Sequence, residues 1–255
     1  QPKTWRNVGL MPLSHEQRRQ FAIGQGVSDP DALLADIRSR DAEEFAERPQ
    51  DLIELCADWR DHRRIRSHRD QVESNIATKL KPRTDRQEQT QLSQEKAIEG
   101  ASRLALAAML TRKLTLRYNA ESDRTPASEP ALDVSKILLD WDSATQATLL
   151  ERPLFGFASY GRVRFHHRSV IEFLAAKRLH EMLESGAAVK AIKRLLFTET
   201  AQRLKVVRPS MRPVAAWLAS WHSTIFDDLI RLDPAVVLDH GDPCQAPRQT
   251  APLTP

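Results

Sequence analysis

Two adjacent histidines, His166 and His167, lie where a β-prone run gives way to a helical pattern, and an imidazole in such a place can bind an anion. The start of a helix carries partial positive charge and unpaired amide donors, so an imidazole beside it can donate to a phosphate. His167 directly precedes the expected helix cap, and we predict that it contacts a phosphate. On this motif alone, the alternative that both histidines are ordinary residues at the end of a strand is favoured.

Two short elements are needed to place His167. Before it, residues 154–157 and 162–165 are β-prone, and Gly161 between them supplies the backbone freedom of a tight hairpin. After it, Ser169 and Glu172 have the spacing of a capping box, which predicts a helix beginning at Val170. One face of that helix is apolar and consists of Ile171, Ala175, Leu179 and Met182.

The sequence contains no complete active site. Residues 156–163 have the glycine spacing of a phosphate-binding P-loop, but Arg162 and Val163 replace its lysine and hydroxyl residue, and β-prone sequence follows where a helix should. The patterns His-Glu-x-x-His and Gly-x-Ser-x-Gly are absent. Asp227 and Asp228 are neighbours that diverge around a helix, so they are poor acid–base partners. We expect neither catalytic residues nor a metal site in this chain.

Composition limits the class of protein. The 255 residues are 41% hydrophobic and 28% charged, enough for one large core or two or three small ones. The net charge of +4 comes from 38 basic and 34 acidic residues, an excess too mild to require nucleic acid as a partner. Cys56 and Cys244 are far apart, which favours reduced thiols in a cytosolic protein. No apolar run is long enough to cross a bilayer, so we expect no membrane partner.

Capping and proline patterns predict the first part of the chain. Residues 1–13 are typical of the exit from a strand-bearing domain that is missing, and the absence of an initial methionine suggests a fragment. Residues 14–63 predict a first helical domain of four short helices, which begin at Ser14 with its partner Gln17, at Pro30, at the cap Asp41 and at Pro49.

The rest of the chain predicts two further domains. Residues 64–184 carry long helices around 69–80 and 91–116, short helices at 134–139 and 144–150, and then the hairpin and helix around His167. These are the parts of a winged-helix domain. Residues 185–242 predict a second helical domain, and the proline-rich residues 243–255 a disordered tail. The expected fold is mainly α: a helical bundle, a winged-helix domain with a two-stranded β-hairpin wing, and a second helical bundle.

Three motifs resemble those of one protein family and occur in the family's order. Residues 165–176 resemble the Phe-x-His-x-Ser-Phe-x-Glu-Phe-x-Ala-Ala signature in the winged-helix domain of NACHT-type STAND NTPases, with Val170 and Ile171 in place of the aromatic-polar pair. Residues 48–52 resemble the proline motif of that family's first helical domain, and residues 10–14 resemble the exit from its nucleotide-binding domain. The likeness covers about residues 8 to 242.

The resemblance implies the regulatory, nucleotide-sensing part of a signalling ATPase, typical of prokaryotic defence or signalling. It implies that Pro49 contacts the adenine of ADP or ATP and that His167 contacts the β-phosphate of ADP. Walker A and Walker B motifs are absent, so the NTPase lobe that would hold Mg²⁺ and hydrolyse ATP must be supplied by the parent protein, together with its effector. The family further implies a cytoplasmic protein that oligomerises on activation.

Two alternatives come from other classes. A winged-helix DNA-binding protein would place the basic segment 60–69 and Arg162, Arg164 and Arg168 against phosphates. Acidic residues interrupt the basic segment and no aromatic residues interleave with it, so nucleic acid is the less favoured partner. The other alternative is a non-enzymatic interaction scaffold, which would respond to no ligand.

Overall fold

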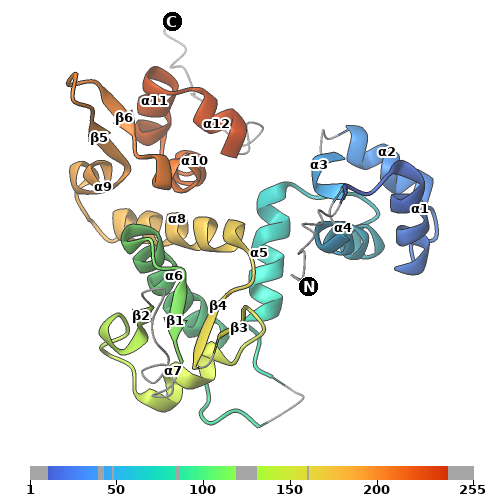
Figure 1. The fold of residues 1–255 in the computed structure, drawn as a ribbon, viewed down its shortest axis with the longest axis horizontal. Coiled ribbons are helices and arrows are strands. Elements are labelled where there is room, and N and C mark those ends of the chain that lie inside the picture. The colour runs from blue at the N-terminus through green and yellow to red at the C-terminus, as the bar shows by residue number, and fades with distance from the viewer. Residues whose placement is uncertain are drawn as a thin grey trace, which may run out of the picture. The chain divides into compact units, whose positions relative to one another are not determined.

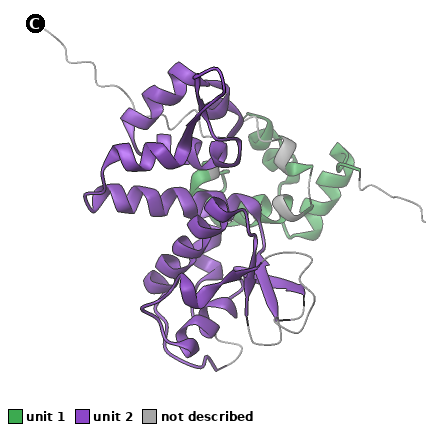
Figure 2. Ribbon diagram, turned by 60° about the vertical axis from the view of Figure 1, so that its left-hand side comes forward, with its two compact units in different colours: residues 1–71 green, residues 72–255 purple. Residues whose placement is uncertain are grey.

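The computed structural model of this chain describes residues 11–39, 43–47, 49–83, 87–118, 131–159 and 161–240. The chain divides into two compact units, residues 1–71 (unit 1) and residues 72–255 (unit 2), coloured separately in Figure 2. The described part is mainly helical, which confirms the expected fold class. The expected exit segment 1–13 and the expected disordered tail 243–255 lie wholly or largely outside the described residues.

Unit 1 is a small helical bundle. Its helices are α1 (His15–Gly24), α2 (Pro30–Ser39), α3 (Glu43–Ala46) and α4 (Pro49–His62). The predicted capping box is present at the start of α1, where Ser14 and Gln17 each accept the other's backbone N–H. The expected cap Asp41 lies outside the described residues. The core of unit 1 is formed by the buried faces of α1, α2 and α4, and includes Leu33, Ile37, Leu52, Leu55 and Cys56.

The border between the units lies inside α5 (His68–Lys79), after Gln71. The expected border between the winged-helix and second helical domains, after residue 184, falls within unit 2. There, one hydrophobic core continues across it, from Val72 to Val237. Unit 2 thus combines both expected domains in a single packed body.

The first half of unit 2 packs helices against a small sheet. Its elements are α6 (Gln94–Thr111), β1 (Thr115–Arg117), β2 (Leu132–Asp133), the 3₁₀ turn Val134–Lys136, α7 (Ser143–Leu150), β3 (Phe155–Ser159), β4 (Arg162–Phe165) and α8 (Arg168–Glu184). The strand order is β2-β1-β4-β3, with β1 parallel to β2 and antiparallel to β4. The sequence predicted the β3–β4 hairpin but not the other two strands. The helix expected over 91–116 ends at Thr111, because Arg112 adopts a left-handed conformation with φ 57° and the chain then enters β1.

The hairpin that precedes His167 is built as predicted. Gly161 at its turn has φ 65°, a conformation that glycine adopts without strain. Phe155 and Phe165 are directly opposite in the register, and their ring centroids are 4.7 Å apart on the buried side of the sheet. This aromatic pair anchors both strands of the hairpin to the core, at the end opposite the turn.

The second half of unit 2 consists of α9 (Val189–Leu196), β5 (Phe197–Glu199), β6 (Lys205–Val207), the 3₁₀ turn Pro209–Met211, α10 (Arg212–Ala219), α11 (Ser223–Leu232) and α12 (Ala235–His240). The antiparallel hairpin β5–β6 was not predicted. Figure 1 shows α8 between α6 and α10, and it packs against both. Phe173 of α8 makes edge contacts with Trp217 and Trp221, at centroid distances of 5.1 and 5.5 Å.

Candidate functional site

His167 is the N-cap residue of α8. Its backbone is extended, with φ −127° and ψ 142°, and its side chain makes no capping hydrogen bond. The first amides of a helix lack partners within the helix, so those at the start of α8 receive no acceptor from the residue that usually supplies one. Half-buried His167 therefore lies beside backbone donors that an external anion can accept from.

The predicted cap at Ser169 is wrong. The helix begins earlier, at Arg168, so Ser169 lies inside its first turn. The reason is a competing contact: Nε of Arg168 donates to Oε1 of Glu172 at 2.8 Å, one turn along the helix. A glutamate held this way is not free to complete a capping box with Ser169.

His166 has a different environment from His167. A Cβ atom on Gly156 would lie 2.6 Å from Cε1 of His166, so the imidazole lies directly on the glycine backbone of β3. Its backbone N–H donates to the carbonyl of Leu154 at 3.1 Å. His166 remains exposed, but its partial burial against Gly156 lowers its pKa, and the positive charges of Lys79, His167 and Arg164 lower that pKa further. The ring centroids of the two histidines are 6.4 Å apart. His166 is thus packed on the wing, and His167 alone marks the start of α8.

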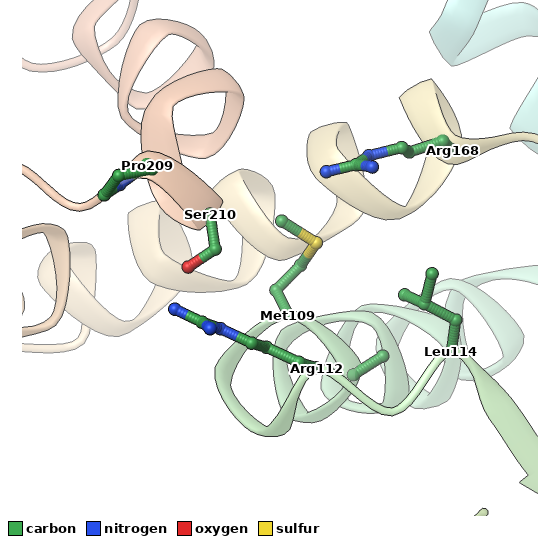
Figure 3. A pocket seen from close by; sticks show the side chains of 7 residues that line it. Met109, Arg112, Leu114, Arg168, Pro209 and Ser210 are labelled. Atoms are coloured by element: carbon green, nitrogen blue, oxygen red, sulfur yellow. The ribbon is translucent and has the colours of Figure 1, made fainter. Parts of the chain in front are cut away.

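A cavity of about 350 Å³ opens beside the first turn of α8 (Figure 3). The end of α6, the first residue of α8 and the turn before α10 contribute its lining residues, Ala108, Met109, Arg112, Leu114, Arg168, Pro209 and Ser210. In Figure 3 the side chain of Arg112 extends toward Ser210, while Met109 lies between α6 and α8. Arg112 and Ser210 were not predicted as site residues, because residues so far apart in the chain give no joint signal.

The charges around this cavity favour an anion. Two of its lining residues are arginines and none is acidic. Arg112 makes no hydrogen bond or ion pair with another described residue, while Arg168 uses its Nε for Glu172 and keeps its terminal nitrogens. Guanidinium groups with free N–H donors suit phosphates and carboxylates.

Pro49, the other predicted site residue, belongs to unit 1, whereas His167 belongs to unit 2. Pro49 is exposed and is the first residue of α4, where its missing N–H leaves no hydrogen bond unmade. The rest of α4 turns Leu52, Leu55 and Trp59 into the core of unit 1. The proline ring is therefore available at the surface of its unit.

The basic residues of the DNA-binding alternative have internal partners. In unit 1, Arg60 donates to the carbonyl of Gln25 at 2.8 Å and Arg63 to Oγ of Ser28 at 2.8 Å. Arg66 forms an ion pair of 2.5 Å with buried Asp58. In unit 2, Arg162 is only 8% exposed. Several arginines of the basic segment and the wing are therefore explained by contacts within their own unit or by burial, without a nucleic acid.

Over the described residues, no group of three or more histidine, cysteine, aspartate or glutamate side chains is arranged to hold a metal ion. Within the same residues, no helix is both long and apolar enough to cross a bilayer. Comparison with models of known protein families and with curated proteins found no match for this chain.

Proposed function

We propose that this chain is the regulatory, nucleotide-sensing part of a STAND-type (NACHT) signalling ATPase. The observation that carries the proposal is the position of His167, as an N-cap residue that makes no capping bond at the start of α8. The fold has the element order that the resemblance implies, with a helical bundle, a hairpin wing, and further helices.

The residues at the start of α8 fit a phosphate. A phosphate oxygen would accept from the free first amides of α8 while His167 donates to it through a ring nitrogen. The helix dipole favours an anion there by about 0.3–1 kcal/mol at an exposed site. ADP is the proposed ligand of the resting state, with its β-phosphate at His167.

The proposal assigns hydrolysis to another part of the parent protein. Mg²⁺ and the Walker residues would come from an NTPase lobe, which together with an effector is the proposed partner of this chain. Exchange of ADP for ATP would remove the contact at His167 and free the surfaces for oligomerisation. Such a switch would serve prokaryotic defence or signalling in the cytoplasm.

The arrangement of α8 supports a switching role. The helix that begins beside His167 packs on α6 and on α10, so the phosphate contact is made by an element that both halves of unit 2 share. A ligand shifts a conformational equilibrium only by its difference in affinity for the two states. A phosphate held by the first turn of α8 provides that difference if the other state moves this turn.

The test is a calorimetric titration of this chain with ADP. We expect saturable binding that His167→Ala weakens about fivefold or more, the loss of roughly 1 kcal/mol. His166→Ala is the matched control, because that imidazole lies on Gly156 and away from the helix cap. Equal ADP affinity of the wild type and His167→Ala would refute the proposal, as would an absence of binding at millimolar ADP.

A further inference from the structure

The segment from residue 187 to 213 differs from the rest of the chain in charge. The whole chain is nearly balanced, with 38 basic and 34 acidic residues, but this segment has one acid, Glu199, and seven lysines and arginines. These basic residues are Lys190, Lys193, Arg194, Arg203, Lys205, Arg208 and Arg212. The segment comprises α9, the β5–β6 hairpin and the turn that leads into α10.

Helix α9 separates its charges from its apolar residues. Lys190, Lys193 and Arg194 are three and four positions apart, so they lie on one face of the helix. Ile192 and Leu196 on the opposite face are buried. The basic face of α9 therefore points away from the core of unit 2.

A single carboxylate ties this face to the hairpin. Asp228 of α11 lies 2.9 Å from Nζ of Lys193, 3.6 Å from Nζ of Lys205 and 2.5 Å from the guanidinium of Arg231. Burial alone would raise the pKa of Asp228, but the three cations, Lys193 first, outweigh it and hold the pKa below its ordinary value. One carboxylate thus pairs with three cations, and a net positive charge remains at this surface.

The hairpin continues the same surface. Lys205 is opposite Glu199 in the β5–β6 register, and its Nζ lies 4.7 Å from the ring centroid of Phe197. Beyond the paired strands, residues 201–205 are all exposed, and Arg203 turns the chain with φ 60°. Figure 1 shows the loop of this hairpin projecting from α9–α12. The tip presents the amide of Gln202 and the guanidinium of Arg203.

We propose that α9 and the β5–β6 hairpin form a binding surface for double-stranded nucleic acid. A two-stranded β-ribbon fits the major groove of DNA, which is about 12 Å wide. Lys190 and Arg194 would contact phosphates beside it, and Gln202 and Arg203 are side chains of the types that bond to base edges. This site is separate from the nucleotide site at His167 and does not depend on it.

A membrane surface fits less well. Interfacial binding needs apolar or aromatic side chains that enter the lipid, in addition to basic ones. Among the large apolar residues described in this segment, Leu204 is the exposed one, with 63% of its surface accessible. Phe197 is buried. A projecting basic hairpin with one exposed leucine matches a groove better than a bilayer.

The experiment measures binding of this chain to a fluorescein-labelled 20-base-pair DNA duplex by anisotropy over a range of NaCl concentrations. We expect wild-type binding that weakens steeply with salt, because bound phosphates release counterions. The variant Lys190→Glu/Arg194→Glu/Arg203→Glu reverses the charge of three exposed side chains that make no hydrogen bond or ion pair with other described residues. It should weaken binding at least tenfold and lower the slope of log Kd against log salt by about 2 to 3.

The matched control changes net charge equally at a different surface. Lys81→Glu/Lys113→Glu/Lys136→Glu, at residues of unit 2 outside the segment 187–213, should retain binding within about threefold, after the general charge effect on association is allowed for. Equal loss in both triple variants would overturn the proposal, as would an absence of DNA binding at low salt. Binding to phosphatidylserine vesicles that the first variant abolishes, without binding to DNA, would assign the surface to membranes instead.

Discussion

Arg152 and Glu88, which are 64 residues apart, form a two-pronged ion pair inside unit 2, with Nε to Oε1 at 3.1 Å and a terminal nitrogen to Oε2 at 2.9 Å. The Arg152 side chain is fully buried, and it also donates to the carbonyls of Leu80 and Leu92. Both carbonyls lie near the ends of the loop between α5 and α6. One arginine therefore connects Leu80, Glu88 and Leu92 to the residues that follow α7.

Arg152→Leu should destabilise unit 2 by about 3–5 kcal/mol, because it leaves Glu88 and two carbonyls without their partner. Urea unfolding followed by circular dichroism measures the change. Arg212→Ala is the control: its ion pair with Asp233 at 2.9 Å is partly exposed, so its loss should cost at most about 1 kcal/mol. Similar costs for the two substitutions would contradict the role given to Arg152.

Gly100→Ala should destabilise unit 2 although alanine is the better helix former. An added Cβ would lie 2.5 Å from the ring of buried Trp141 and 3.0 Å from Leu149. Overpacking of this kind costs about 1–3 kcal/mol, which outweighs the gain of about 1 kcal/mol in propensity. Gly24→Ala in α1 is the matched control, since its Cβ would meet no atom within 4 Å. Thermal unfolding should show a lower midpoint for the first variant and no loss for the second.

Histidine titration by NMR should find the pKa of His166 below its ordinary value of 6.5. Between the lowered pKa of folded His166 and 6.5, the unfolded chain binds more protons than the folded one. The free energy of unfolding therefore rises as pH rises toward 6.5. His166→Asn should therefore flatten the pH dependence of stability there. Lys79→Met, which removes one positive neighbour, should move the pKa of His166 upward. Titration of wild-type His166 at or above 6.5 would show that the packing on Gly156 is not maintained in solution.

The elements that the sequence predicted well carry their own local signals. Ser14 with Gln17, and prolines 30 and 49, mark the starts of α1, α2 and α4, where caps and proline act on the nearest amides. The same kind of signal failed at Ser169, because the ion pair of Arg168 with Glu172 competes with the capping box for the glutamate. A local rule holds only where no neighbouring side chain makes a better bond.

Elements that depend on distant partners were missed. Strands β1 and β2 have three and two residues, too few for a periodic pattern, and each exists because it pairs with another. The β5–β6 hairpin turns at Arg203, with a positive φ that is usually signalled by glycine. Within the candidate site, the position of His167 followed from local sequence. The cavity did not follow from local sequence. Arg112, Arg168 and Ser210 line it together only because α6, α8 and the turn before α10 pack against one another.

The composition of α8 gives it a mechanical property. Its 17 residues contain neither glycine nor proline, so at about 1.5 Å per residue it is a stiff rod of roughly 25 Å with no built-in joint. Ala175 and Ala176, both fully buried, pack the middle of the helix closely against its neighbours. A tilt imposed on its first turn cannot be absorbed along its length. The end at Leu183 must swing in response, and the tryptophans of α10 and the residues after it must follow or lose their contact with Phe173.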